Sequence, residues 1–199
     1  LELLQEEPQP YAKHVHALVL TPTRELAAQV RESVYTYGKF TATKSAAVFG
    51  GAKIFPQKSK LKKGVDILVA TPGRLLDLHN QKAVKLNRVK ILVLDEADHM
   101  LDMGFIHDIK KIINLLPKRR QNLMFTATFS NPFRKLANEL VDNPIEISVT
   151  SDNETAANVN HYIHPVDKSR KAELLIELIE PEKWKQALVF TRPTHGADR

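Results

Sequence analysis

The sequence contains no cysteine, which excludes a disulfide framework and a thiolate metal site. This composition fits a reducing compartment, so we expect a cytoplasmic protein. No apolar run approaches the roughly 18 residues of a membrane-spanning helix. The N-terminal LELLQEEPQP lacks the basic start and apolar core of a signal peptide. These absences together predict no membrane partner.

Glycine and aromatic residues are also few. The seven glycines lie at positions 38, 50, 51, 64, 73, 104 and 196, and none has the spacing G-x-x-x-x-G-K-[ST] of a phosphate-binding loop. The chain has one tryptophan, four tyrosines and eight phenylalanines, most of them within apolar patterns. They indicate no obvious platform on which bases could stack. If nucleic acid binds, the composition favours contacts with the phosphate backbone over contacts with bases.

The remaining composition is that of an ordinary globular protein, with 43% hydrophobic and 26% charged residues. A chain of 199 residues has room for one large domain, or for one domain and part of another. The formal net charge of +6 modestly favours a polyanionic partner.

The most informative stretch is VKILVLDEADHMLDMGF, from Val89 to Phe105. Its apolar run predicts a strand buried on both faces, as in a parallel sheet covered by helices. Ligands of such sheets bind at the carboxyl ends of the strands, where Asp95 and Glu96 follow. Two adjacent carboxylates there suit Mg²⁺, which takes few protein ligands and keeps several waters. The alternative is an acidic helix start, because carboxylates favour a helix N-terminus.

Two further predicted strands, 16–20 and 66–70, run into helices through the sequences TPTRE and TPGR. Such junctions point backbone N–H groups at a phosphate above them, and an arginine adds a bidentate contact. The alternative is an ordinary capped helix with a surface arginine. The predicted caps and arginines are Thr23 with Arg24, and Thr71 with Arg74.

The rest of the chain continues the alternation of strands and helices. We expect strands at 44–49, 122–125 and 145–149, the first ending in Gly50-Gly51 and the second in Thr126-Ala127-Thr128. Helices are expected over 105–116 and from Asn131. The polar stretch 150–160 is typical of a linker. A strand at 161–165, a helix and a strand at 187–190 then predict the start of a second domain.

These motifs, in this order and spacing, resemble those of the DEAD-box RNA helicases, and the bacterial RhlE-type members most. The resemblance covers essentially the whole chain. Its elements are Pro22–Ala27 (motif Ia), Gly50-Gly51 (the GG element), Thr71–Arg74 (motif Ib), Asp95-Glu96-Ala97-Asp98 (motif II), Thr126–Thr128 (motif III) and Val189–Arg192 (motif IV).

The resemblance implies an α/β fold in which a RecA-like parallel sheet is flanked by helices. Residues 1–150 would form an incomplete first helicase domain, residues 151–160 a linker, and residues 161–199 the start of a second RecA-like domain. The family's phosphate loop and adenine-reading Q motif lie upstream of the matched region, and motifs V and VI lie downstream. We therefore expect this chain to be a fragment that is inactive alone.

The resemblance also implies ATP-dependent unwinding of RNA, with ATP and Mg²⁺ as cofactors. Asp95 would hold Mg²⁺ largely through water, and Glu96 would complete the metal shell and activate the attacking water. Asp98, Thr126 and Thr128 would couple the nucleotide state to domain closure. Thr126 departs from the family's usual serine, which we expect to weaken that coupling at most. The residues expected to grip the RNA backbone are Pro22, Thr23, Arg24, Gly50, Gly51, Thr71, Pro72, Gly73 and Arg74.

Three other functions fit parts of the pattern. The first is a non-enzymatic remnant that binds the RNA backbone. The second is a DNA-directed helicase or translocase of the same superfamily. The third is a phospho-acceptor signalling domain. Such a domain would have no arginine-bearing strand-to-helix junctions, whereas this sequence has two. The sequence predicts neither the RNA substrate nor the oligomeric state.

The resemblance makes one geometric prediction about strand order. In this superfamily the strand that leads into the phosphate loop lies between the motif III strand and the last strand of the domain. The segments 122–125 and 145–149 should then be separated by one empty strand position. That separation is about 9–10 Å, twice the usual spacing between strands.

Overall fold

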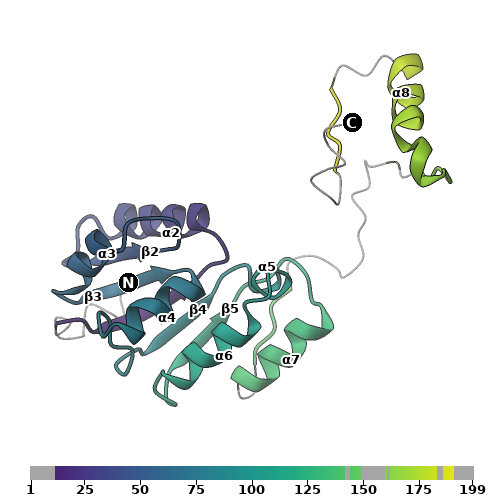
Figure 1. Ribbon diagram of the computed structural model, residues 1–199. Helices are drawn as coiled ribbons and strands as arrows, with labels where there is room; N and C mark the ends of the chain where they lie inside the picture. The colour runs from purple at the N-terminus through teal and green to yellow at the C-terminus, as the bar shows by residue number, and fades with distance from the viewer. Residues whose placement is uncertain (1–11, 142–143, 149–159, 161, 183–185, 191–199) are drawn as a thin grey trace. The chain divides into compact units, whose positions relative to one another are not determined.

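The computed structural model describes residues 12–141, 144–148, 160, 162–182 and 186–190. The chain divides into two compact units, residues 1–146 and residues 147–199, which are described separately. Figure 1 shows the elements of each unit.

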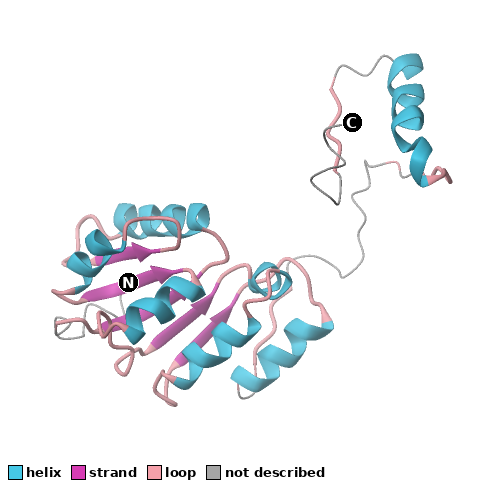
Figure 2. Ribbon diagram, in the orientation of Figure 1, coloured by secondary structure: helices cyan, strands magenta, loops and turns pink. Residues whose placement is uncertain are grey.

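The first unit is built on a five-stranded parallel sheet with the order β2-β3-β1-β4-β5. Figure 2 shows the strands running in the same direction. The strands correspond within about two residues to those predicted from the apolar runs, so the α/β fold class and the parallel sheet are confirmed. Their bounds are β1 (Val15–Leu20), β2 (Ser45–Val48), β3 (Val65–Ala70), β4 (Ile91–Leu94) and β5 (Gln121–Met124).

Helices cover both faces of this sheet. Successive side chains of a strand point to opposite faces, and both sets are mostly apolar in β1 and β3, so both faces must be covered. Val30 and Val34 of α2 pack against one face, and the other helices form a larger core on the opposite face. No helix in the described segments is long and apolar enough to cross a membrane. The helices of this unit are α2 (Arg24–Tyr37), α3 (Ile54–Leu61), α4 (Pro72–Asn80), α5 (Ala97–Asp102), α6 (Ile106–Asn114) and α7 (Asn131–Leu140).

Burial of β4 differs from the prediction. Leu92 and Leu94 are buried, but Ile91 and Val93 on the other face are only half-buried. That face is covered in the described residues by α2, which lies over β2 and β3 rather than over β4. The strand is therefore fully buried on one face only.

Three predicted strands are absent from the residues that the structure describes. The segments 144–148, 162–165 and 187–190 have no strand structure, and Ile145, Ile163 and Phe190 are exposed. A strand persists only when its backbone groups pair with a neighbouring strand, and none of the described strands pairs with these segments. The three strand predictions were wrong because an apolar run forms a strand only if another strand pairs with it, and that partner comes from residues distant in the chain.

The helix predicted in the second unit is present as α8 (Lys171–Glu182), preceded by the short 3₁₀ turn η1 (Lys168–Arg170). Leu174, Leu175, Leu178 and Ile179 are its half-buried side chains. The predicted linker 151–160 lies outside the described residues except for Asn160.

Candidate functional site

The loops that carry the predicted motifs lie at one edge of the sheet, because parallel strands have their carboxyl ends together. Backbone hydrogen bonds continue the sheet into four of these loops. They run from Thr21 N to Ala70 O (3.0 Å), Thr71 N to Val48 O (3.1 Å), Asp95 N to Leu20 O (3.0 Å) and Phe125 N to Leu94 O (2.8 Å). The strand order then gives the order along the edge: Gly50-Gly51, 71–74, 21–24, 95–98 and 126–128.

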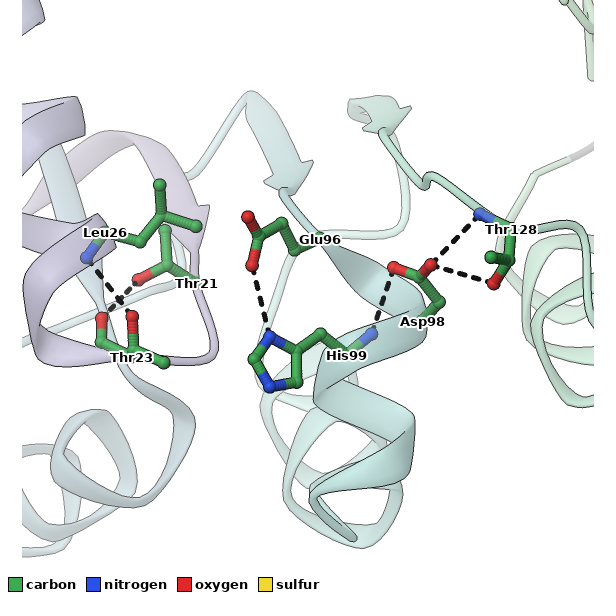
Figure 3. A network of polar contacts seen from close by, with 7 residues as sticks. All are labelled: Thr21, Thr23, Leu26, Glu96, Asp98, His99 and Thr128. Carbon is green, nitrogen blue, oxygen red and sulfur yellow. Dashed lines mark hydrogen bonds and ion pairs between the residues drawn. The ribbon is translucent and has the colours of Figure 1, made fainter. Parts of the chain in front are cut away.

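The junction after β1 is the capped turn that its sequence predicts. The Thr23 hydroxyl accepts a hydrogen bond from Leu26 N at 3.2 Å, as Figure 3 shows, and so caps α2. The Arg24 guanidinium is exposed and lies 3.2 Å from the Glu25 carboxylate. Gly51 comes next to it, since a Cβ there would stand 3.8 Å from Arg24 Nη1. The φ of +72° at Gly51 is what requires glycine.

The junction after β3 has a different arrangement. Pro72 occupies the first turn of α4 and Thr71 is the N-cap residue, but the Thr71 side chain makes no capping hydrogen bond. The Arg74 side chain is only 13% exposed and its Nη1 donates to Ala52 O at 3.1 Å. Arg74 therefore holds the loop that follows Gly50-Gly51, whereas Arg24 has the more exposed guanidinium of the two predicted arginines.

The acidic pair lies at the end of β4. Asp95 is half-buried, and burial raises the pKa of its carboxyl, as does the neighbouring Glu96 charge, against a hydrogen bond from the Glu96 backbone. Glu96 is in the left-handed region, with φ 50° and ψ 53°. This conformation costs a non-glycine residue roughly 1–3 kcal/mol and recurs at functional sites.

His99 is a neighbour of the acidic pair that the motif pattern missed. Its Nδ1 lies 3.2 Å from Glu96 Oε2, and both side chains are half-exposed (Figure 3). The two residues are three apart at the start of α5, a spacing that places them on one helix face. That spacing is the signal by which the sequence could have predicted the contact.

The donor set at Asp95 and Glu96 fits Mg²⁺ better than it fits a transition metal. The described residues contain no group of three or more histidine, cysteine, aspartate or glutamate side chains placed to bind a metal. Mg²⁺ needs only one or two carboxylates, since water and phosphate complete its shell. Asp95 supplies a half-buried carboxylate beside a second negative charge, an arrangement that a cation would stabilise.

Asp98 connects the acidic loop with the loop after β5. Its Oδ2 accepts hydrogen bonds from Thr128 N (3.0 Å) and Thr128 Oγ1 (2.8 Å), and its Oδ1 accepts from His99 N (3.0 Å), as Figure 3 shows. Burial acts to raise the pKa of Asp98, but the hydrogen bonds from Thr128, His99 and Thr126 lower it overall. Thr126 Oγ1 also donates to Thr128 O at 2.8 Å. The structure thus brings together the three residues predicted to act in coupling.

Comparison with known proteins matches residues 1–136 to the family described as DEAD/DEAH box helicase. The chain is 39% identical over 184 residues to the DEAD-box ATP-dependent RNA helicase RhpA of Helicobacter pylori, covering 92% of this chain and 37% of that protein. It is 37% identical over 195 residues to CshA, the DEAD-box ATP-dependent RNA helicase of Bacillus subtilis, covering 98% of this chain and 40% of CshA. The chain thus spans well under half of these relatives.

Solved structures agree with this match. A DEAD box protein from the hyperthermophile Methanococcus jannaschii aligns with a TM-score of 0.67 and 35% identity, over 89% of this chain and 47% of that one. The yeast DEAD-box splicing factor Prp28 aligns with a TM-score of 0.63 and 32% identity, over 71% of this chain and 34% of that one. With the family match over residues 1–136 and the motif loops gathered at one sheet edge, this chain belongs to the DEAD/DEAH box helicase family.

Proposed function

We propose that the protein containing this chain is an ATP-dependent RNA helicase that couples ATP hydrolysis to local unwinding of RNA duplexes. The observation that carries this proposal is the place of the Asp95–Glu96 pair. It lies between the loops predicted to hold RNA and the Asp98–Thr128 contact, all at one edge of one sheet. Hydrolysis, RNA contact and a link between them can therefore meet in this unit.

Asp95 and Glu96 would hold Mg²⁺, and the chemistry that the ion would supply there is neutralisation of phosphate charge. Glu96 would also orient the attacking water and take its proton. The contact of Glu96 Oε2 with His99 Nδ1 at 3.2 Å supports this role, because it favours one orientation of the carboxylate. Positioning and charge neutralisation provide most of the catalysis in this class of reaction.

RNA contact would be made through the sugar–phosphate backbone and would be independent of sequence. The exposed Arg24 guanidinium would contact a phosphate, competing with its present partner Glu25. The loops at Gly50-Gly51 and 71–74 lie beside it and present backbone groups. Phosphate contacts position the nucleic acid but do not read its bases.

Asp98 would transmit changes at the nucleotide to the loop at 126–128 through its bonds to Thr128. We also propose that the chain is of the bacterial RhlE type, from the order and spacing of its motifs. The proposed domain bounds remain 1–150 for the first helicase domain, 151–160 for the linker and 161–199 for the second domain.

Glu96→Gln in a protein that contains this chain and a phosphate loop tests the proposal. RNA-stimulated phosphate release should fall by at least about 100-fold, as expected when a general base is removed, while binding of a fluorescent ATP analogue is retained. Glu32→Gln is the matched control, because Glu32 is an exposed carboxylate on α2. Normal turnover by the Glu96→Gln protein would remove Glu96 from catalysis.

The chain of 199 residues should not hydrolyse ATP by itself, because its sequence holds no phosphate-binding loop. The measurement is phosphate release with and without RNA. RNA-stimulated release above background from the purified chain would contradict the prediction.

A further inference from the structure

The edge of the sheet opposite the motif loops is formed by the segments that precede the strands, at the tails of the arrows in Figure 2. Hydrogen bonds join these segments into one surface. They run from Asp66 N to Lys44 O (2.8 Å), Val65 N to His14 O (3.1 Å), Lys85 N to Lys13 O (2.8 Å) and Gln121 N to Lys90 O (2.8 Å). The surface therefore extends across all five strands.

This surface, at the amino ends of the strands and called the amino edge below, is strongly basic. The segments 12–14, 38–44, 60–64, 81–90 and 117–120 contain lysine and arginine but no aspartate or glutamate. Asp66 lies beside them at the start of β3, but it is buried and its Oδ2 accepts a hydrogen bond from Lys44 N at 2.7 Å. The opposite edge has Glu25, Asp95, Glu96 and Asp98, so positive charge is concentrated on the amino edge. Its exposed cations are Lys39, Lys44, Lys60, Lys62, Lys63, Lys82, Lys85, Arg88, Lys90, Lys118 and Arg119.

Several of these cations have no ion-pair or hydrogen-bond partner among the residues that the structure describes. Within the described part of the chain, the side chains of Lys62, Lys63 and Lys85 form no ion pair or hydrogen bond. Arg120 is different, because it donates to Pro117 O at 2.7 Å and to Asn122. Like charges gathered in this way repel one another, and a polyanion relieves that repulsion.

Two lysines of the amino edge have backbones in the left-handed region. Lys13 has φ 65° and Lys82 has φ 55°, and Lys13 Nζ donates to Lys82 O at 3.0 Å. Lys82 follows the last turn of α4, with its N–H bonded to His79 O at 2.8 Å, a position that helices usually give to glycine. Lysine is thus present where backbone conformation favours another residue, which agrees with a use for its charge.

Aromatic side chains stand beside these charges, whereas the composition had indicated no obvious platform for stacking. Phe40 is 93% exposed and Lys39 Nζ lies 5.6 Å from the centre of its ring. Tyr37, the last residue of α2, is 78% exposed. A basic groove or edge with exposed rings is the arrangement by which proteins bind single-stranded nucleic acid, since phosphates meet the cations and bases stack on the rings.

We infer that the amino edge is a second RNA-binding surface, which holds single-stranded RNA by phosphate contacts and by stacking on Phe40. It is distinct from the edge of the sheet that carries the motif loops (the motif edge) and lies at the other end of the strands. Five strands at about 4.8 Å spacing span roughly 19 Å, enough for several consecutive nucleotides. One unit could then hold a strand at the amino edge while the motif edge contacts RNA undergoing unwinding.

The test uses this chain, fluorescein-labelled oligouridine and a KCl titration followed by anisotropy. The variant Lys62→Gln/Lys63→Gln/Lys85→Gln should reduce the slope of log K against log salt by about 2, at about 0.7 per phosphate on a single strand. Each lost contact of that slope lowers affinity about fivefold at 0.1 M salt. The control variant Lys135→Gln/Lys168→Gln/Lys171→Gln removes three exposed lysines elsewhere and should keep the slope.

The same titration in an Arg24→Ala background separates the two edges. Loss of slope from the Lys62, Lys63 and Lys85 changes in that background supports the second surface, even if Arg24→Ala has no effect of its own. An unchanged slope overturns the inference but does not bear on RNA binding at the motif edge. Equal losses from the control lysines overturn it as well, since they would show only a general charge effect.

Phe40→Leu tests the stacking. It should weaken oligouridine binding about fivefold or more, in keeping with stacking on an aromatic ring, but should leave inorganic polyphosphate binding unchanged. Equal affinity of Phe40→Leu and the parent chain for oligouridine overturns stacking. Binding to phosphatidylserine vesicles that oligouridine does not compete for would assign the edge to a membrane surface and overturn the inference.

Discussion

The contact between Asp98 and Thr128 gives the sharpest test of the geometry at the motif edge. Thr128→Val keeps the shape of the side chain and removes the 2.8 Å hydrogen bond from Oγ1, while Thr128 N still donates to Asp98. Asp98→Asn removes the charge that receives three hydrogen bonds, from Thr128 N, Thr128 Oγ1 and His99 N. The double variant measures how far the two changes depend on each other.

The magnitudes follow from the number of hydrogen bonds and the exposure of the groups. A hydrogen bond to a charged group contributes about 1.5–3 kcal/mol when water is excluded. Thr128 is exposed and Asp98 is half-buried, so water replaces part of that contribution. We expect Thr128→Val to lower the free energy of unfolding by about 1 kcal/mol, Asp98→Asn by about 2 kcal/mol, and the coupling energy to be about 1 kcal/mol.

Urea unfolding followed by circular dichroism measures these free energies, and hydrogen exchange at the Thr128 amide reports the loop itself. The folded-state pKa of Asp98 is lowered, so its stabilisation is present above the ordinary carboxyl pKa of about 3.9 and is lost as pH falls through the folded value. The difference between the parent and Asp98→Asn should therefore be larger at pH 7 than at pH 3.

Asp102→Asn is the control, because Asp102 is an exposed carboxylate at the end of the same helix. It should change the free energy of unfolding by less than about 0.5 kcal/mol. A coupling energy below about 0.3 kcal/mol at pH 7, within the usual error of additivity, would refute the contact as a source of stability.

Three further predictions follow from the motif edge and the sheet. Arg24→Ala, in a protein that contains this chain, should reduce the salt slope of RNA binding by about 0.7 for all RNA sequences alike, which titrations on two unrelated sequences would check. Arg74→Ala should lower the free energy of unfolding by about 1 kcal/mol in a urea titration, because Ala52 O loses its hydrogen-bond donor. Since β5 has a strand partner on one side only among the described strands, the chain should self-associate or bind a complementing strand peptide, and a strictly monomeric sedimentation profile with no peptide binding would contradict this.

Local patterns predicted the sheet and its motif edge well. The apolar runs placed the five strands, and the Thr-Pro sequences after β1 and β3 placed the starts of α2 and α4. These features depend on residues close in the chain, where burial and capping act directly. Parallel strands then bring their carboxyl ends together without further information from the sequence.

Long-range contacts could not be predicted from the pattern of residues. Asp98 and Thr128 are 30 residues apart, and only the pairing of β4 with β5 brings their loops together. Arg74 and Ala52 are 22 residues apart, and only the fold brings Arg74 Nη1 within 3.1 Å of Ala52 O; its expected phosphate contact stays a prediction. The segment 144–148 is apolar enough for a strand, yet no described strand pairs with it. The 9–10 Å gap between 122–125 and 145–149 stays a prediction.

At Glu96, the left-handed backbone lowers the stability of the fold, whereas the proposed catalytic role requires the carboxylate. Glycine would adopt φ 50° and ψ 53° without the steric cost that a Cβ brings, so replacing Glu96 with glycine would remove the strain that the Glu96 Cβ causes. A laboratory selection for thermal stability alone would therefore favour losing this glutamate, whereas, on the proposed function, a selection for ATP turnover by a protein that contains this chain would restore it. Stabilised variants of a protein that contains this chain should be sequenced at position 96 first, because on the proposed function stability gained at that position is gained at the expense of turnover.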